Sequence, residues 1–380
     1  MPNSYGLLCA YPPTHSGAAS FAAGLLRALT RPGSGTAAGV VRVVDVVGAP
    51  TGPEVVEHLD ARRPDGPAAA ARALDRFDVA LIQYGDGMYG EPDGTRLLEV
   101  LDALRVPAVL VLHNVPRTPT PRQRWVLEQA LCAAAAVVVL AEVARRRILT
   151  GYAVDAAKLV VIPPGAPDRI RTAGPREGDV PMILTWGLLG PGKGIEWAIG
   201  GLQRLKELRP APRYLIVGET HPQVRQSRGE AYRLGLRNRA RALRVAELVR
   251  FRPNYLPVGE LDRLIQRADV ILLPDDSSEA VTSGVLVEAV ASGKPVVAAA
   301  FPHAIELLAN GVGLVVPRGN SAAIGEALHR VLTGPDLADQ MAGRAARIAP
   351  SLLWPAVARR YRTVIDGLVD PRSAATVPAA

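Results

Sequence analysis

Short apolar runs alternate with amphipathic segments along the first half of the chain. Runs of this kind, bounded by glycine, proline or polar residues, are typical of strands buried in a parallel sheet. The predicted strands are 5–10, 40–47, 79–83, 106–112, 136–140 and 159–162. Apolar positions spaced by three and four residues predict helices at 18–30, 121–134 and 142–151. The segment 48–68, rich in Gly, Pro and charge, is predicted to be loop or weak helix.

A second series begins at Met182, after a stretch at 164–180 whose Pro, Gly and charged residues are typical of a linker. Its predicted strands are 183–186, 214–218, 248–251, 270–273 and 296–300. Its predicted helices are 195–208, a long polar helix from 219, 259–268, 285–291, 322–332, 337–348 and a last helix with Trp354 and Tyr361. A chain of 380 residues has room for two domains, so the pattern predicts two Rossmann-like α/β domains.

The stretch 269–319 holds the strongest candidate chemistry. A buried strand leads through an acidic loop to Thr282 and Ser283, both favourable helix N-cap residues, and to Gly284, where a ligand can approach the backbone closely. The free amides of this first turn, with the helix dipole, favour an anion such as a phosphate. Glu288, about one turn further on, could reach hydroxyls of the same ligand. The alternative is an ordinary capped helix with a surface glutamate.

The loop at 187–194 has almost the spacing of a P-loop. Gly187 is followed after four residues by Gly192 and Lys193, but Gly194 stands where a P-loop needs Ser or Thr to hold magnesium. Lys193 is one of four lysines beside forty arginines, and a compact ammonium suits a point contact to a diphosphate oxygen. The loop therefore predicts a phosphate cradle without a metal ligand.

Three features of the N-terminal half are candidates for substrate binding. A loop after the first strand ends in Gly17. The backbone of Gly17 either faces a ligand or only forms a turn. The glycine-dense loop 84–94 follows another strand, where function concentrates in α/β proteins, and we assign it to acceptor binding. His113 lies at the carboxyl end of a strand, where it can donate a hydrogen bond to substrate, although a lone histidine is often structural.

The composition and charge of the chain limit the classes of function that fit it. The formal net charge of +8 fits nucleic acid, anionic lipid or a phosphorylated substrate. The arginines between Arg225 and Arg252 are spaced like solvated helix faces with few aromatics between them, which argues against nucleic acid. Contact with an anionic membrane stays open. Two cysteines, Cys9 and Cys132, suggest no disulfide framework, and we see no secretory signal or membrane span, so we expect a cytoplasmic protein.

Several motifs, taken in order, resemble family 4 glycosyltransferases, and most closely a bacterial subgroup with Thr-Ser-Gly in the donor loop. They are Gly-x-x-x-Pro-Gly-Lys-Gly-Ile-Glu from Gly187, Thr-Ser-Gly-x-x-x-x-Glu-Ala from Thr282, Ser-Gly-Lys-Pro-Val-Val from Ser292, His303-Ala304-x-Glu306-Leu307-Leu308, and Gly311-x-Gly313-Leu314-Val315-Val316-Pro317. The resemblance implies a GT-B fold, with two Rossmann-like domains facing across a cleft. It divides the chain into an acceptor-side domain 1–175, a donor domain 176–350, a helix 351–370 that crosses back to the first domain, and a disordered tail 371–380.

The resemblance also implies a chemistry. A retaining hexosyltransferase would move a sugar from a GDP- or UDP-linked donor to a glycan, lipid-linked or small-molecule hydroxyl, by front-side transfer and without a metal ion or other cofactor. His113 and Lys193 are the implied catalytic residues, and the loop of Arg252 would lie beside the nucleotide base. The implied donor-binding residues are Gly17, Gly187, Gly192, Lys193, Arg252, Thr282, Ser283, Gly284, Val285 and Glu288.

The chain departs from the family pattern at three positions. Leu188 replaces the arginine that usually joins the lysine on the diphosphate, Ala280 replaces a glutamate that contacts the donor sugar, and Pro164 stands where histidine is frequent. The Thr-Ser-Gly subgroup generally lacks that glutamate. The losses at Leu188 and Ala280 leave a second hypothesis open, a nucleotide-sugar-binding scaffold with weakened catalysis. A sugar-nucleotide epimerase or a phosphorylase is a third, and a phosphorylase would need a cofactor-binding lysine site that we do not find.

Overall fold

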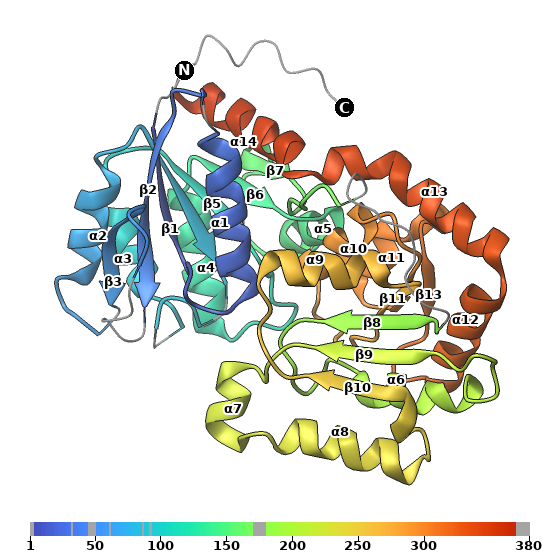
Figure 1. Ribbon diagram of the computed structural model, residues 1–380. Coiled ribbons are helices and arrows are strands. Elements are labelled where there is room, and N and C mark those ends of the chain that lie inside the picture. The colour runs from blue at the N-terminus through green and yellow to red at the C-terminus, as the bar shows by residue number, and fades with distance from the viewer. Residues whose placement is uncertain are drawn as a thin grey trace. The chain divides into compact units, whose positions relative to one another are not determined.

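A computed structural model describes residues 4–31, 33–44, 51–60, 62–85, 87–90, 93–169 and 180–369. The chain divides into two compact units, Met1–Gly165 together with Trp354–Ala380, and Ala166–Leu353, which we call unit 1 and unit 2 (Figure 1). The sequence analysis set the boundary at 175/176. Residues 170–179 of the predicted linker and the predicted disordered tail lie outside the described residues.

Unit 1 is built on a seven-stranded parallel sheet in the order β3-β2-β1-β4-β5-β6-β7. Its strands are β1 Ser4–Cys9, β2 Ala37–Val44, β3 Val55–Asp60, β4 Val79–Tyr84, β5 Ala108–Leu112, β6 Ala136–Val139 and β7 Leu159–Val161. Its helices are α1 Gly17–Leu29, α2 Gly66–Leu74, α3 Arg96–Ala103, α4 Pro121–Ala133, α5 Glu142–Gly151, the short η1 Ala156–Lys158 and α14 Trp354–Val369. The order of strands reverses between β1 and β4, which makes this pair the topological switch point of unit 1.

The last helix of the chain completes the core of unit 1. Residues Val357, Tyr361 and Ile365 of α14 are buried beside α1 and the sheet. Trp354 begins this helix. A Cβ added to Gly24 would lie 2.3 Å from its indole ring, and a Cβ added to Gly165 would lie 2.1 Å from it. The ring therefore fits only because both positions are glycine.

Unit 2 is built on a six-stranded parallel sheet in the order β10-β9-β8-β11-β12-β13. Its strands are β8 Met182–Trp186, β9 Arg213–Val217, β10 Val249–Arg252, β11 Val270–Leu273, β12 Val296–Ala299 and β13 Leu314–Val316. Its helices are α6 Ile195–Gly201, α7 Pro222–Arg228, α8 Ala231–Ala242, α9 Val258–Arg267, α10 Gly284–Ala291, α11 Pro302–Leu307, α12 Ser321–Thr333 and α13 Pro335–Leu352, with short turns η3 Leu202–Arg204, η4 Ala246–Leu248 and η5 Ala309–Gly311. The switch point of unit 2 lies between β8 and β11.

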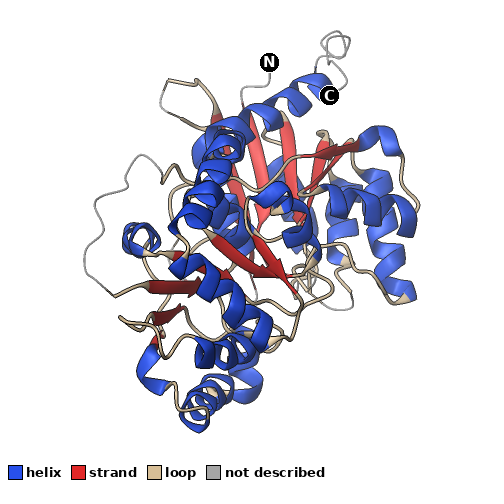
Figure 2. Cartoon of the chain, turned by 90° about the vertical axis from the view of Figure 1, so that its right-hand side faces the viewer, coloured by secondary structure: helices blue, strands red, loops and turns tan. Residues whose placement is uncertain are grey.

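In each unit, apolar strands are covered by helices on both faces (Figure 2). Burial on both faces explains why most strands are continuous apolar runs rather than alternating ones. The two sheets confirm the predicted pair of Rossmann-like α/β domains. Within the described residues, no helix combines the length and apolar character that crossing a membrane requires.

Three predicted elements were wrong. Segment 48–68 was predicted as loop or weak helix, but residues 55–60 form β3, an edge strand whose polar residues hid it. The helix predicted over 195–208 ends at Gly201, which packs closely on Gly325 of α12 and gives way to a 3₁₀ turn. The long polar helix after 219 is two helices, because Gly229 takes a positive φ of 55° between α7 and α8. Residues 45–47 of the second predicted strand lie outside the described residues.

Candidate functional site

The predicted phosphate-binding residues of unit 2 lie on loops that follow the two strands of its switch point. The glycine loop follows β8, and the acidic loop follows β11. Gly187 begins the glycine loop with a φ of +124°, and Gly194 ends it with a φ of +62°. A Cβ on Gly194 would lie 1.9 Å from the carbonyl oxygen of Pro274, at the start of the acidic loop. Glycine is thus required there because the two loops pass too closely for any side chain.

Hydrogen bonds join the two loops directly. The Nζ atom of Lys193 lies 2.7 Å from Oδ1 of Asp275. The amide of Asp276 donates to the carbonyl of Gly192 at 3.0 Å, and the indole Nε1 of Trp197 donates to the Asp276 carboxylate at 3.1 Å. The structure therefore joins the glycine loop of Lys193 to the start of the loop that leads to Thr282, Ser283 and Gly284, and it gives Lys193 a carboxylate partner that was not predicted from the sequence.

The first turn of α10 is arranged as the sequence analysis expected. Ser283 is the N-cap, and its Oγ accepts a hydrogen bond from the amide of Leu286 at 3.2 Å. A Cβ on Gly284 would find no atom within 4 Å, so the backbone there is open to a ligand. Val285 places its Cγ2 3.9 Å from the position that a Cβ on Gly187 would occupy, which sets this turn against the glycine loop. The Thr282 hydroxyl is buried and has no partner among the described residues.

A histidine holds this turn in place. Nδ1 of His303 accepts a hydrogen bond from the amide of Ser283 at 2.9 Å. His303 is 3% exposed, and burial lowers its pKa to about 4, so the ring is neutral near pH 7 and its Nδ1 can accept. The bond uses the Ser283 amide and leaves those of Gly284 and Val285 for a ligand. In the sequence, His303 belongs to one of the family motifs, and this contact was not predicted for it.

Glu288 is part of a partly buried ion cluster around Arg169. Its Oε2 lies 3.2 Å from Nη2 of Arg169, a side chain that is 3% exposed. Nε of the same guanidinium donates to Asp262 of α9 at 2.5 Å. Burial raises the pKa of the Glu288 carboxyl, and the charge of Arg169 offsets part of that rise. Arg169 lies within the predicted linker 164–180 and belongs to no local motif, so the sequence offered no signal for it.

Of two further arginines of unit 2, Arg252 was predicted from the sequence and Arg318 was not. Arg252 ends β10, the edge strand, and pairs with Glu260 of α9. Arg318 follows β13 and donates to the carbonyl of Asp276 at 3.0 Å. It is therefore an arginine close to the loops that are predicted to bind phosphate, in a chain that has Leu188 at the usual arginine position of the family.

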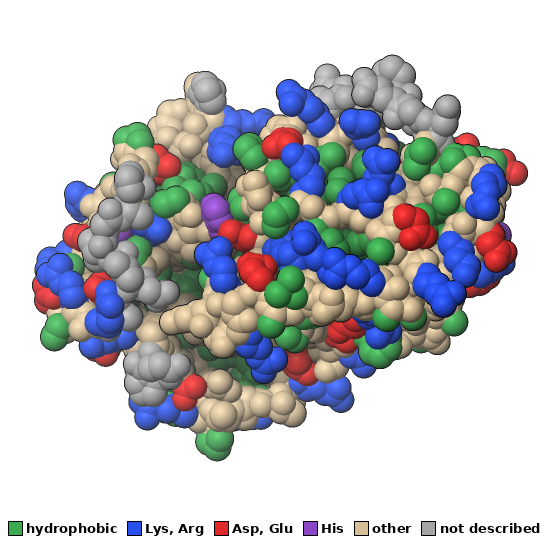
Figure 3. All heavy atoms as spheres, turned by 60° about the horizontal axis from the view of Figure 1, so that its bottom comes forward, with side chains coloured by type: hydrophobic (Ala, Val, Ile, Leu, Met, Phe, Trp, Pro, Cys, Tyr) green, Lys and Arg blue, Asp and Glu red, His purple; other side chains and the backbone are tan. Residues whose placement is uncertain are grey.

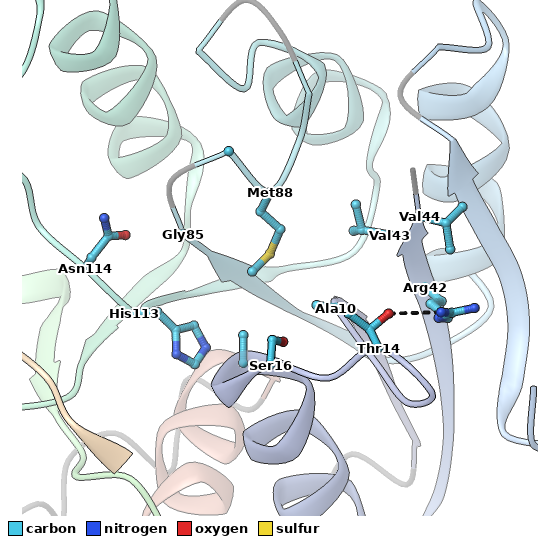
Figure 4. A pocket seen from close by; sticks show the side chains of 12 residues that line it. Ala10, Thr14, Ser16, Arg42, Val43, Val44, Gly85, Met88, His113 and Asn114 are labelled. Carbon is cyan, nitrogen blue, oxygen red and sulfur yellow. Dashed lines mark hydrogen bonds between the residues drawn. The ribbon is translucent and has the colours of Figure 1, made fainter. Parts of the chain in front are cut away.

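Unit 1 has a pocket of about 560 Å³ at its own switch point. The pocket is lined by residues that follow β1, β4 and β5, by the end of β2 and by the start of α1 (Figure 4). Ser16 caps α1 by accepting from the amide of Ala19 at 3.1 Å, and Gly17 is the first residue of that helix. Gly85, Gly87 and Met88 come from the loop predicted to bind acceptor, of which residues 86, 91 and 92 lie outside the described residues.

His113 lies at one end of this pocket. Its Nε2 is 3.1 Å from Oε1 of Gln83, and the ring of Phe21 packs edge-on against it at 4.9 Å between centroids. Desolvation lowers the pKa of His113 to about 4, so the ring is neutral at physiological pH. A neutral imidazole in this position can exchange a hydrogen bond with a substrate hydroxyl rather than offer it a positive charge.

The arginine-rich segment of α7 and α8 makes many contacts within the chain. Arg237 lies over the ring of Phe251 at 5.5 Å, Arg239 over Trp197 at 5.7 Å, and Arg233 is buried. On the face shown in Figure 3, basic side chains are dispersed with acidic ones between them. Both cysteines are free thiols, Cys9 buried and Cys132 exposed.

Comparison with known families matches both units. The family model described as Glycosyltransferase Family 4 matches residues 18–169, and the model described as Glycosyl transferases group 1 matches residues 168–347. The chain belongs to the glycosyltransferases. The resemblance to family 4 enzymes is thereby confirmed, whereas membership in the Thr-Ser-Gly subgroup stays a prediction.

Curated relatives of this glycosyltransferase include two proteins named D-inositol 3-phosphate glycosyltransferase. The protein of Actinosynnema mirum is 32% identical over 251 residues, which cover 62% of this chain and 58% of the relative. The protein of Kineococcus radiotolerans is 28% identical over 309 residues, which cover 72% of this chain and 69% of the relative. The first match thus spans less than two thirds of the length of the relative.

Solved structures share the fold of this glycosyltransferase over nearly its whole length. A glycosyltransferase of Rickettsia africae matches with a TM-score of 0.74 at 17% identity, covering 97% of this chain and 99% of that one. Anabaena HepE in complex with UDP matches with a TM-score of 0.74 at 18% identity, covering 96% and 100%. These matches confirm the predicted GT-B fold.

Proposed function

We propose that this protein is a retaining glycosyltransferase that moves a sugar from a nucleoside-diphosphate sugar to a hydroxyl acceptor without a metal ion. The observation that carries the proposal is the junction of two loops at the β8/β11 switch point. There the glycine loop that carries Lys193 is joined to the loop that leads to α10 by the 2.7 Å contact between Lys193 and Asp275 and by the bond from Asp276 to Gly192. Val285 of α10 also lies close to Gly187 of the glycine loop. Open parallel sheets bind nucleotides at such a point.

The positive groups of this region suit a diphosphate leaving group. The amides of Gly284 and Val285 lie at the positive end of α10, and Lys193 supplies a full charge that can leave Asp275 for a phosphate oxygen. Departure of the nucleoside diphosphate develops negative charge, and fixed donors of this kind stabilise it. In the proposed role, Glu288 holds the ribose hydroxyls, oriented by Arg169, and Arg318 takes part of the role of the arginine that Leu188 replaces.

The proposed transfer keeps the configuration of the sugar. The bond between the anomeric carbon and the diphosphate oxygen breaks, and the acceptor oxygen bonds to the same face of that carbon. The acceptor proton passes to the leaving phosphate. In unit 1, His113 lies in the pocket where we place the acceptor, and its neutral ring accepts or donates a hydrogen bond there. We retain the cytoplasmic location, the Thr-Ser-Gly subgroup and contact with an anionic membrane as predictions.

A panel of nucleotide sugars tests the donor. The unfolding temperature of the full chain is measured with UDP-, GDP- and ADP-sugars, beginning with UDP-glucose because Anabaena HepE was solved in complex with it. A ligand at 100 times its dissociation constant adds about 2.7 kcal/mol to the free energy of unfolding, so a true donor raises the unfolding temperature clearly. An absence of any shift across the panel contradicts the proposed donor class.

The reaction itself needs three further measurements. Release of nucleotide with and without acceptors reports turnover, NMR of the product reports the anomeric configuration, and a chelator reports metal dependence. Retention and unchanged turnover with the chelator support the proposal, whereas inversion or loss of turnover contradicts it. Donor binding without turnover on any acceptor would favour the scaffold hypothesis, to which the replacements at Leu188 and Ala280 point.

A further inference from the structure

A buried arginine lies at the end of the unit 1 pocket opposite to His113. Arg42 is 6% exposed and comes from the middle of β2, where its neighbours in the strand are valines. Its Nε donates to the carbonyl of Tyr11 at 3.1 Å, and its Nη2 donates to the Thr14 hydroxyl at 2.9 Å. Figure 4 shows Arg42 and His113 at the two ends, with Ser16 between them.

The charge of Arg42 has no acidic partner among the described residues, where its two bonds go to neutral oxygens. A guanidinium has five N–H donors, so several remain for a ligand in the pocket. Keeping a cation away from water costs several kcal/mol unless an anion compensates it. The described residues fix this guanidinium with two hydrogen bonds to neutral oxygens, and an anionic group of a ligand would compensate its charge.

The rest of the pocket fits a phosphate beside Arg42. The fork of a guanidinium matches two oxygens of a phosphate. Helix α1, of 13 residues, begins at the pocket, and its N-terminus favours negative charge. The Ser16 oxygen accepts from the amide of Ala19, so its hydroxyl hydrogen is free to donate to a phosphate oxygen. Ala10, Val43 and Met88 add apolar walls that suit a carbon skeleton.

We infer that the acceptor is a hydroxyl compound that carries a phosphate monoester, such as a sugar or polyol phosphate, with its phosphate on Arg42. The reacting hydroxyl then lies toward His113, and the pocket of about 560 Å³ holds a molecule of this size. The inference rests on the proposed function, since it specifies the acceptor of that transfer. The phosphate can belong to a free metabolite or to a lipid headgroup, and the experiment separates these two sources.

Matched pairs of acceptors test the inference. With the donor found in the panel, kcat/KM is measured for glycerol and glycerol 3-phosphate, glucose and glucose 6-phosphate, and inositol and its monophosphates. Vesicles of phosphatidylinositol phosphate, with phosphatidylcholine as the blank, test the lipid source. We expect the phosphorylated member of at least one pair, free or in vesicles, to be preferred by about 100-fold or more. Equal use of both members in every pair overturns the inference.

Arg42→Gln should reduce this preference to about tenfold or less, because the phosphate loses its charged partner. Arg105→Gln is the matched control, since Arg105 is an exposed arginine of unit 1 outside the pocket, and it should keep the full preference. The ratio within each pair is the readout, so a general loss of activity does not imitate the result. A preference that survives Arg42→Gln overturns the inference.

Two further measurements test the inference if Arg42→Gln does not fold or if no donor is found. If Arg42→Gln does not fold, Thr14→Val, which removes one bond that orients the guanidinium, should lower the same ratio, and an unchanged ratio counts against Arg42. If no donor is found, calorimetry with inorganic phosphate is still informative. If phosphate binds the wild-type chain and Arg42→Gln or Thr14→Val weakens that binding, the phosphate site is supported even though no transfer was detected. If phosphate does not bind the wild-type chain, the inference is overturned.

Discussion

The switch points of the two units share a topology but differ in how their charges are satisfied. Each lies where the order of a parallel sheet reverses, and beside each a helix begins with a serine N-cap followed by glycine, Ser16–Gly17 in unit 1 and Ser283–Gly284 in unit 2. In unit 1 a pocket stays open and Arg42 has only neutral partners among the described residues. In unit 2 the ammonium of Lys193 is already paired with Asp275.

We interpret the unit 1 site as preformed for its ligand and the unit 2 site as one whose ion pair must break before a ligand binds. On the proposed function, the acceptor enters a pocket whose cation is fixed in advance, whereas the donor diphosphate has to take the place of Asp275 on Lys193. The two units are alike in one other respect, because each holds a neutral histidine at its site, His113 and His303, whose pKa burial lowers to about 4. Four predictions test the comparison.

The largest effect is expected from removing the ammonium of unit 2. Lys193→Ala should lower turnover by at least about 100-fold, because the leaving diphosphate loses its one lysine contact. Initial rates at saturating donor and acceptor measure this. Lys206→Ala, an exposed lysine of the same unit, serves as the control and should be close to wild type. Near-normal turnover of Lys193→Ala would remove Lys193 from the site.

The second prediction concerns the histidine of unit 2 and pH. The folded-state pKa of His303 is about 4 against about 6.5 in the unfolded chain, so the unfolded chain binds more protons between these values. The free energy of unfolding should therefore fall as pH is lowered from about 6.5 to 4, and His303 should account for about 2–3 kcal/mol of that fall.

Urea unfolding at several pH values measures this contribution. His303→Asn should flatten the pH dependence, and His329→Asn, a histidine on α12, should leave it as in the wild type. If both variants keep the wild-type slope between pH 6.5 and 4, His303 is not neutral in the fold and its bond to the Ser283 amide needs another explanation.

A smaller effect is expected at the glycines that begin the two helices. A Cβ on Gly17 or on Gly284 would meet no protein atom within 4 Å, so alanine should leave the free energy of unfolding unchanged or raise it by about 0.4–1 kcal/mol. A methyl group there obstructs only a ligand. We expect Gly17→Ala to raise the KM for acceptor and Gly284→Ala the KM for donor, each about tenfold.

Steady-state kinetics with each substrate varied in turn separates the two effects. Gly343→Ala, at a position in α13 that is equally open, is the control. Variants that both behave like this control would show that neither helix start touches a substrate.

The smallest effect is expected from releasing Lys193. Asp275→Asn should lower the KM for donor by about threefold, since the ion pair that the diphosphate displaces is partly exposed and such pairs contribute about 1 kcal/mol or less. Titration of the donor against initial rate measures it, with Glu326→Gln, which breaks an exposed pair with Arg204, as the control. A higher KM would mean that Asp275 helps to hold the donor rather than competing with it.

Much of this architecture could be predicted because its signals are local. The strands of both sheets are apolar runs, and Ser283 caps α10 as its residue type indicated. The strand β3 was missed since its exposed edge position allows polar residues such as Glu57 and His58. Arg42 could have been noticed, because an arginine within the apolar run Val40–Val44 is unusual for a buried strand.

Other contacts of the site could not be predicted, because no local sequence pattern indicates them. The partner of Glu288 is Arg169, which lies far away in the sequence and within a region of linker composition. The histidine that accepts from the Ser283 amide is twenty residues further on and reaches it across another helix start. Pairings of this kind depend on how the loops pack, which periodicity does not report.

The sequence by itself determined the two α/β domains, a helix cap at Thr282 or Ser283 and the glycine loop with its single lysine, because periodicity, capping and turn chemistry act over a few neighbouring residues. Only the tertiary structure decided which charges meet. Lys193 and Asp275 are 82 positions apart in the chain, and they pair because β8 and β11 lie side by side in the sheet. Arg42 lacks such a partner among the described residues, where its hydrogen bonds go to two neutral oxygens of the loop after β1.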